Sequence, residues 1–167
     1  MGESTALNIL KNAILLERRG KAFYSKIANQ TDSDAVKRFF GMMAAEEEKH
    51  VNILSDQFKT YQKTQTFAPG EYDDKHTNNI AAEILTEDMK AQISASEFEA
   101  AAISAAMAME KNAVRLYSER AEASEDPVEK SLYQWLAEWE HQHLDFLAEI
   151  DRQITEAIWH DNSFWPF

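Results

Sequence analysis

Four glutamates and two histidines recur along the chain at fixed intervals, and their side chains suit metal binding. Glu17 and Glu47 lie 30 residues apart, and His50 follows three residues after Glu47. The same intervals recur 93 residues further on, so the complete set is Glu17, Glu47, His50, Glu110, Glu140 and His143. Carboxylate oxygens and imidazole nitrogens are ligands that suit iron or manganese. The pattern therefore predicts a site for two metal ions.

Each Glu-x-x-His pair needs a helix to bring its two side chains together. Residues three apart in a helix share one face, so Glu47 and His50 can point to one site, as can Glu140 and His143. A single pair of this kind is weak evidence, because Glu is common in this chain and such pairs usually face solvent. The prediction therefore depends on the whole set of six and on its repeated intervals.

A second copy of the pair, Glu138 and His141, overlaps the first on the same predicted helix. The repeat distinguishes the two copies, because Glu138 and His141 align with Ala45 and Glu48, which form no such pair. We therefore expect Glu138 and His141 at the surface. Glu46 and Glu48 are interpreted as surface residues or as hydrogen-bond partners of the ligands.

Four inward glutamates need compensating charge. Glutamate is almost never fully buried without a partner, and four uncompensated buried carboxylates would be prohibitively unstable. Lys21, one turn from Glu17, is the nearest cationic residue on the predicted inner faces. Two divalent cations would balance the four carboxylates and leave both imidazoles neutral. We expect two iron ions, with manganese or zinc as alternative metals.

Two tyrosines occupy equivalent positions in the repeat, two turns after the first glutamate of each half. Tyr24 follows Glu17, and Tyr117 follows Glu110, on the same predicted helical faces. One interpretation makes them core aromatics whose hydroxyls find some partner. The other makes them hydrogen-bond donors to a ligand carboxylate. The sequence leaves both interpretations open.

Long helices must carry these residues, and the composition favours them. The chain has 167 residues with only four Gly and three Pro, so few positions interrupt a helix. Asp32 and Glu125 lie midway between the glutamates of each half, and both fall in clusters of turn-forming residues. Residues equidistant from a hairpin turn lie at the same height. The two glutamates of each half should therefore face each other.

The 93-residue repeat indicates two helical hairpins joined by a long connection. Helices of roughly 28 residues reach about 40 Å, and a connection of about thirty residues can span that length. We predict an all-α four-helix bundle of two antiparallel hairpins joined by one long crossover. An up-down bundle with a flexible linker is the alternative. The predicted single domain, residues 1–167, contains a hairpin at 4–64, the crossover at 65–94, a hairpin at 95–159 and an aromatic tail at 160–167.

The composition excludes several other kinds of site. Cysteine is absent, which excludes disulfides, cysteine-ligated iron–sulfur clusters and four-cysteine iron centres. The net charge of −12 argues against nucleic acid, which needs clustered Lys and Arg. The most apolar run, Ala100 to Met109, is too short to span a membrane, and the start of the chain shows no secretory signal. We expect a cytoplasmic homodimer whose aromatic tail docks on the bundle or on the partner subunit.

These residues resemble the ferritin-like diiron superfamily, and most of all its rubrerythrin-like members. Ala13 to Tyr24 is similar to that family's first helix, and Phe39 to His50 is similar to its second. The resemblance covers the four helices but neither the connection nor the tail. It implies a ferritin-like fold and a diiron site at the six ligands.

The resemblance also implies an activity. Rubrerythrins usually carry a further carboxylate on the third helix, where this chain has Ala113. The lack of cysteine excludes a rubredoxin centre, so the resemblance implies a separate electron-donor protein and a diiron oxidoreductase that reduces peroxide or dioxygen. The alternatives are iron oxidation for storage or detoxification, as in bacterioferritin, a diiron hydroxylase with an apolar substrate pocket, and a metal-binding bundle without turnover.

Overall fold

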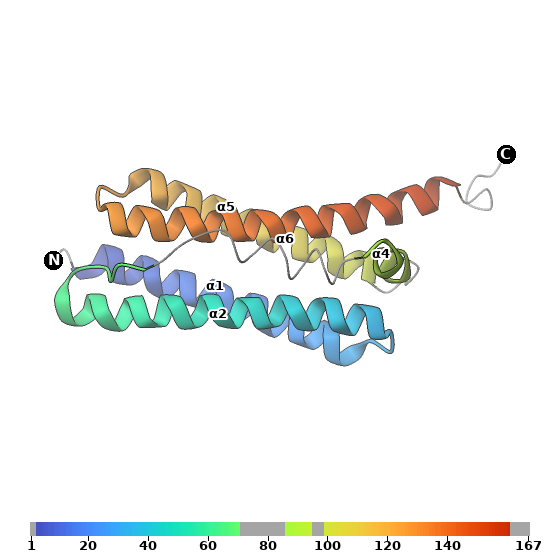
Figure 1. Ribbon diagram of the computed structural model, residues 1–167, viewed down its shortest axis with the longest axis horizontal. Helices are drawn as coiled ribbons and strands as arrows, with labels where there is room; N and C mark the ends of the chain where they lie inside the picture. Colours follow the sequence, from blue (N-terminus) through green and yellow to red (C-terminus); the bar gives the residue numbers. More distant parts are fainter. Residues whose placement is uncertain (1–2, 71–85, 95–98, 161–167) are drawn as a thin grey trace.

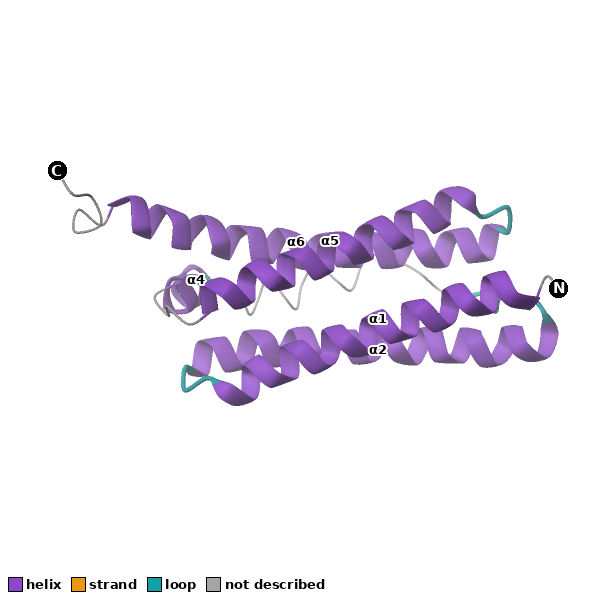
Figure 2. Ribbon diagram, turned by 180° about the vertical axis from the view of Figure 1, so that it is seen from behind, coloured by secondary structure: helices purple, strands orange, loops and turns teal. Residues whose placement is uncertain are grey.

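Two antiparallel helical hairpins form the body of the protein (Figure 1). In the first hairpin, α1 (Glu3–Gln30) packs along α2 (Asp34–Thr64). In the second, α5 (Glu99–Ala123) packs along α6 (Pro127–His160). All four helices follow the long axis of the molecule, as views from the two opposite sides show (Figures 1 and 2).

A long connection joins the two hairpins. The computed structural model describes residues 3–70, 86–94 and 99–160, and the short helix α4 (Glu87–Ser94) lies at the end of the bundle where α5 begins. Because α2 ends at the opposite end (Figure 1), the chain between α2 and α4 joins the two ends of the bundle, and α2 and α5 run in the same direction. The predicted all-α four-helix bundle with one long crossover is confirmed, and the up-down alternative is wrong.

The hairpin ends differ slightly from the predicted ones. The first hairpin begins at Glu3, one residue earlier than predicted, and ends at Thr64. Helix α6 continues to His160, which is the first residue of the predicted tail. The rest of the predicted tail, at 161–167, and the predicted start of the third helix, at 95–98, lie outside the described residues.

Short polar turns connect the two helices of each hairpin. In the first turn, Ser33 caps α2, and its side chain accepts a hydrogen bond from the backbone N–H of Val36. In the second turn, the Asp126 side chain accepts a hydrogen bond of 2.8 Å from the backbone N–H of Val128. Each cap satisfies a backbone donor that the first helical turn leaves without a partner. Pro127 begins α6, where its missing N–H removes no helical hydrogen bond.

The core consists of two apolar clusters separated by a polar layer. The cluster nearer the α1–α2 turn includes Tyr24, Phe39, Phe40, Met43, Ile103 and Leu147. The cluster nearer the α5–α6 turn includes Leu10, Leu54, Tyr117, Leu132, Tyr133 and Leu136. The polar layer lies between them, at the middle of all four long helices. Apolar side chains therefore exclude water from this layer on both sides along the bundle axis.

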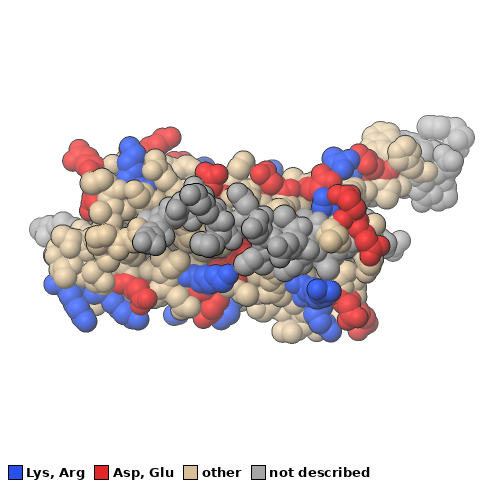
Figure 3. Space-filling model, viewed as in Figure 1, with Lys and Arg blue, Asp and Glu red and all other residues tan. Residues whose placement is uncertain are grey.

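The outer surface of the bundle carries charged side chains of both signs (Figure 3). Acidic and basic side chains are interspersed over the face shown in Figure 3. Among the described residues, the large apolar side chains with high exposure are Leu15, Ile158 and Trp159, the last two on the part of α6 that extends past the first hairpin (Figure 1). None of the described helices has an apolar stretch that could cross a membrane.

Candidate metal centre

All six predicted ligands lie in the polar layer between the two apolar clusters. Helix α1 contributes Glu17, α2 contributes Glu47 and His50, α5 contributes Glu110, and α6 contributes Glu140 and His143. None of the six residues is more than 3 % exposed. The structure thus brings together, in one buried layer, residues that are spread over more than a hundred positions of the chain.

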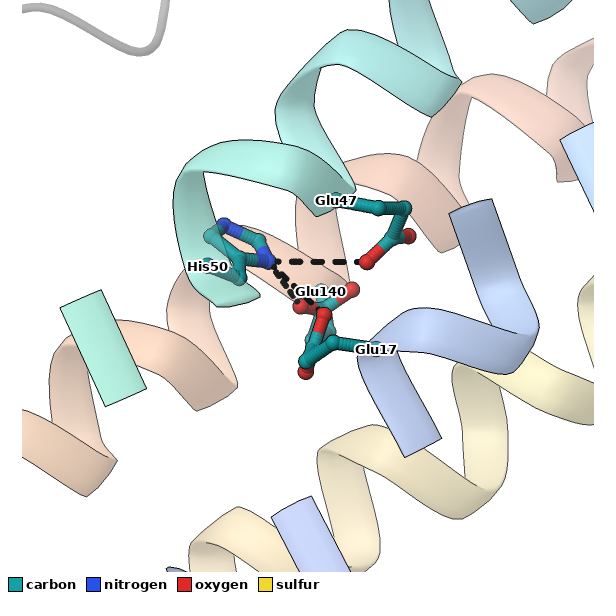
Figure 4. A group of neighbouring side chains, drawn as sticks. All are labelled: Glu17, Glu47, His50 and Glu140. Carbon is teal, nitrogen blue, oxygen red and sulfur yellow. Dashed lines mark hydrogen bonds and ion pairs between the residues drawn. The ribbon is translucent and has the colours of Figure 1, made fainter. Parts of the chain in front are cut away.

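The ligand atoms of these residues form two overlapping groups. One group consists of Glu17, Glu47, His50 and Glu140 (Figure 4), and the other of Glu47, Glu110, Glu140 and His143. Within each group, the candidate ligand atoms all lie within 4.8 Å of one another. Glu47 and Glu140 belong to both groups. These two carboxylates would therefore contribute to both halves of a two-ion site, and each remaining residue would contribute to one half.

The distances between ligand atoms match those around a metal ion. His50 Nδ1 lies 2.8 Å from Glu140 Oε1 and 3.1 Å from Glu17 Oε2. His143 Nδ1 lies 3.3 Å from Glu140 Oε2 and 3.6 Å from Glu110 Oε1. Atoms that each bind one ion at about 2.1 Å are spaced at about 3 Å from one another. Both imidazoles thus present Nδ1 to the carboxylates at a spacing that suits a shared ion.

The cluster contains no Lys or Arg among the described residues, so its charge must be compensated in another way. Lys21, which helical periodicity placed on the inner face, instead contacts Glu48 and is 44 % exposed at its side chain. That expectation is therefore wrong, because Lys21 reaches outward to solvent and to a neighbouring carboxylate. His143 Nδ1 is buried and has no hydrogen-bond partner among the described residues. A metal ion would use this nitrogen and neutralise the carboxylates around it.

Without metal, bound protons must reduce the repulsion between the buried carboxylates. Burial raises the pKa of Glu47, and the nearby Glu140 raises it further. Burial and Glu140 likewise raise the pKa of Glu110 to about 7. Burial alone would lower the pKa values of His50 and His143, but the surrounding carboxylates raise both well above the ordinary value. Divalent cations would displace these protons, so the donor set fits two metal ions.

Two tyrosine hydroxyls hold carboxylates of the site from across the bundle. Tyr24 on α1 donates a hydrogen bond to Glu110 Oε1 on α5, and Tyr117 on α5 donates one to Glu17 Oε1 on α1. Both tyrosines are fully buried. Of the two interpretations of these residues, the structure favours hydrogen bonds to the ligands. Each tyrosine contacts the glutamate of the other hairpin, so the pair ties the two hairpins together at the site.

Glu46 is a partner of the site that the sequence left undecided between surface and interior. It is buried, and its Oε2 lies 2.5 Å from His143 Nε2 and 3.1 Å from Trp139 Nε1. These hydrogen bonds, chiefly the one from His143, lower the pKa of Glu46 although burial opposes the change. Its neighbour Glu48 lies instead at the half-exposed surface beside Lys21. Glu46 aligns with Trp139 in the 93-residue repeat, and this match to an aromatic position could have indicated that Glu46 points inward.

Gly20 lies against the carboxylate of Glu47, which belongs to both ligand groups. A Cβ atom at Gly20 would lie 3.2 Å from Glu47 Cδ, closer than most van der Waals contacts. Gly20 also lines a small opening between α1 and α5, together with Leu16, Met109 and Ala113, and this opening reaches the four glutamates of the site. No interval in the sequence marks Gly20, because its closeness to Glu47 depends on how α1 packs against α2.

Glu138 and His141, the second Glu-x-x-His copy, lie away from the centre. Both are exposed and line a surface groove between α5 and α6. His141 Nε2 lies 3.9 Å from Asp145 Oδ1, and neither Glu138 nor His141 belongs to a ligand group within the part of the chain that the structure describes. The repeat therefore assigned the two copies to the correct faces of α6.

Comparison with known proteins identifies the family. The family model described as Rubrerythrin matches residues 8–151, a stretch that holds all six candidate ligands, both tyrosines and Glu46. No curated protein and no solved structure matches the chain. The matched stretch covers most of the 167 residues, and its helical bundle has the ferritin-like arrangement of that family. The chain belongs to the rubrerythrin family.

Proposed function

We propose that this protein is a non-haem diiron oxidoreductase that reduces hydrogen peroxide or dioxygen at the buried cluster. The observation that carries the proposal is the pair of overlapping ligand groups that share Glu47 and Glu140. Two bound ferrous ions would supply one electron each. Reduction of one hydrogen peroxide to two waters consumes these two electrons and two protons. A separate electron-donor protein would then restore the ferrous state.

The side chains of the protein bind the ions, orient the ligands and exclude bulk water. Four carboxylates balance the charge of two divalent cations, and both imidazoles complete the ligand set. Tyr24 and Tyr117 hold Glu110 and Glu17 in place, because a hydrogen bond from a hydroxyl fixes the orientation of a carboxylate. The apolar clusters on both sides keep the effective dielectric constant low and so strengthen these interactions.

The size of the opening at the site supports a small oxidant as substrate. The cavity that reaches the four glutamates between α1 and α5 has a volume of about 10 Å³, which is the space of roughly one water molecule. A diatomic oxidant or peroxide needs little widening of such an opening. An organic substrate, as in a diiron hydroxylase, would need a much larger apolar pocket beside the ligands.

Iron oxidation for storage is the alternative that oligomeric state can distinguish. A storage role needs a closed cage of many subunits, whereas we propose a homodimer. Light scattering of the purified protein measures its mass in solution. A dimer would leave no enclosed volume for an iron mineral, whereas a large closed assembly would favour storage over peroxide reduction.

The direct test of the proposed activity is the rate at which the ferrous protein is oxidised. The metal-free protein is loaded anaerobically with ferrous iron and mixed with hydrogen peroxide or with air-saturated buffer. We expect faster oxidation by peroxide than by air, and loss of the reaction in Glu140→Ala. Glu138→Ala, which removes an exposed carboxylate from the same helix, is the matched control and should react like the wild type. Equal rates in wild type and Glu140→Ala would rule out the proposed site.

A further inference from the structure

The two halves of the metal site differ at the residue that precedes each Glu-x-x-His pair. Glu46 precedes Glu47 on α2, and Trp139 precedes Glu140 on α6, at equivalent positions of the 93-residue repeat. In the structure both side chains reach toward the histidine of the opposite hairpin. A charged residue in one half therefore corresponds to an aromatic residue in the other, directly beside the ligands.

The side facing His143 provides a carboxylate. Glu46 Oε2 lies 2.5 Å from His143 Nε2 and also accepts a hydrogen bond of 3.1 Å from Trp139 Nε1. Because a carboxylate only accepts hydrogen bonds, the proton of the neutral imidazole stays on Nε2. The lone pair then lies on Nδ1, which faces Glu110 and Glu140. A carboxylate on the far nitrogen of a metal-binding histidine fixes the ring and makes it a stronger ligand.

On the other side of the site, two tryptophan rings lie beside His50. Trp139 lies edge-on to His50, with ring centroids 5.0 Å apart and an interplanar angle of 88°. Trp135 lies at 6.0 Å from the same ring. His50 Nε2 is buried and has no hydrogen-bond partner among the described residues. The rings restrict the position of the imidazole, but they do not accept its proton as a carboxylate would.

We infer that Glu46 is a positioning residue that makes the two metal positions unequal, so that the position served by His143 binds a divalent ion more tightly than the position served by His50. The inference rests on the proposed dimetal site and adds an order of filling to it. A single equivalent of metal occupies the group of Glu47, Glu110, Glu140 and His143 first. The second equivalent completes the group that contains Glu17 and His50.

Anaerobic titration of the metal-free protein with cobalt(II) tests this order without any turnover. The visible absorption of cobalt(II) reports its ligand geometry, so two unequal positions give two distinct phases. We expect wild type to bind two ions with affinities that differ by about tenfold or more, and Glu46→Ala to weaken the tighter phase by about 10- to 100-fold. Glu46→Gln keeps an oxygen acceptor without the charge and should fall between them.

Three further variants separate the position of Glu46 from its charge and assign each phase. Glu48→Ala removes the same charge two residues further along α2, where Glu48 contacts Lys21 at the surface, and should titrate like the wild type. His143→Ala should remove the tighter phase, and His50→Ala the weaker one. These two variants keep Glu46 and so test the order of filling even if Glu46→Ala does not fold.

Each outcome of the titration bears on one claim. Two equal phases in the wild type, or a tighter phase that survives in His143→Ala but not in His50→Ala, would overturn the inequality while leaving the dimetal site intact. Equal losses in Glu46→Ala and Glu48→Ala would overturn the role of Glu46. Failure of the wild type to bind cobalt(II) in stoichiometric amounts would instead refute the dimetal site itself.

Discussion

At the scale of single residues, hydrogen bonds from one hairpin orient carboxylates of the other. Tyr24 and Tyr117 each donate to a glutamate across the bundle. Burial, aided by the nearby carboxylates, raises the pKa of both hydroxyls well above the ordinary value. Both tyrosines therefore remain protonated donors throughout the physiological pH range. Their effect on the ligands can be separated from their packing by removing the hydroxyl alone.

Tyr117→Phe should lower the affinity of the metal-free protein for cobalt(II) by about tenfold, because Glu17 loses the donor that orients it. Tyr133→Phe is the matched control. Tyr133 is fully buried and stacks on Tyr117 with centroids 5.9 Å apart, but its hydroxyl has no hydrogen-bond partner among the described residues. Its loss should leave the affinity unchanged. Equal effects of the two substitutions on the titration would show that the hydroxyl of Tyr117 does not act through Glu17.

Gly20 lies against Glu47, whereas Gly41 faces open space, so substitutions at the two glycines can be compared. Alanine in a helix interior is more stable than glycine by about 0.5–1 kcal/mol. Gly41→Ala on α2 should show this gain, since nothing lies within 4 Å of the added Cβ. Gly20→Ala should show a smaller gain or none and should weaken metal binding by about tenfold, because the Cβ must displace Glu47. Urea unfolding and metal titration measure both effects, and equal behaviour of the two variants would contradict the contact.

At the scale of the elements, each hairpin must hold its two helices in register so that ligands 30 residues apart reach the same height. The second hairpin has a partly buried ion pair close to its turn. Arg120 Nε donates to Glu129 Oε1 at 2.7 Å, and Arg120 Nη2 donates to Oε2 at 2.8 Å. The Ser124 hydroxyl also donates to Oε2, at 2.6 Å. These bonds connect the last turn of α5 to the first turn of α6.

Glu129→Ala should destabilise the protein by about 2–3 kcal/mol, because it leaves Arg120 and Ser124 without their shared acceptor. Glu119→Ala breaks an exposed pair with Arg115 on the same helix and should change the stability by less than about 0.5 kcal/mol. The free energies come from urea unfolding of the two variants and the wild type. Similar losses in both variants would mean that the pair at the turn contributes no more than a surface pair.

The sequence predicted the helices and the meeting of the six candidate ligands in one buried layer, because both depend on intervals along the chain. Glu17 and Glu47 are equally far from the turn at Asp32. Predicting that they face each other therefore required only that the hairpin be antiparallel. The partners from the other hairpin were harder to predict. Which glutamate Tyr24 contacts depends on how the two hairpins face each other, and no local interval encodes this.

The assignment of Lys21 failed, and that of Glu46 stayed open, for a similar reason. Lys21 lies one turn from Glu17 and so shares roughly its face, but a long flexible side chain can reach outward from the edge of that face to Glu48. Glu46 stands next to a ligand in sequence and points to a different side of α2, where α6 happens to supply His143 and Trp139. Helical period gives the direction of a side chain, whereas its partner depends on the packing of the bundle.

At the scale of the whole molecule, the buried carboxylates link folding to protons and to metal. In the metal-free protein, burial and the neighbouring carboxylate raise the pKa of Glu110 to about 7 and also raise that of Glu47. The carboxylates raise the pKa values of His50 and His143. For all four groups the folded state binds more protons than the unfolded state. Their contribution to stability is therefore present at low pH and is lost as the pH rises.

The metal-free protein should become less stable as the pH rises from about 5 to 8, the range that begins near the ordinary pKa of glutamate and passes the raised pKa of Glu110. The lowered pKa of Glu140, caused by the two histidines against the effect of burial, acts only below this range. Urea unfolding in the presence of a chelator measures the trend. Glu110→Gln, which cannot ionise, should flatten it, and a stability that increases with pH would contradict the account.

Crystals loaded anaerobically with ferrous iron would show whether two metal ions bind among the six candidate ligands. Diffraction recorded at the iron absorption edge locates each iron by its anomalous scattering. We expect two peaks, one beside Glu17 and His50 and one beside Glu110 and His143, with Glu47 and Glu140 between them. Absence of iron from this layer, or iron bound only at the exposed Glu138 and His141, would contradict this expectation.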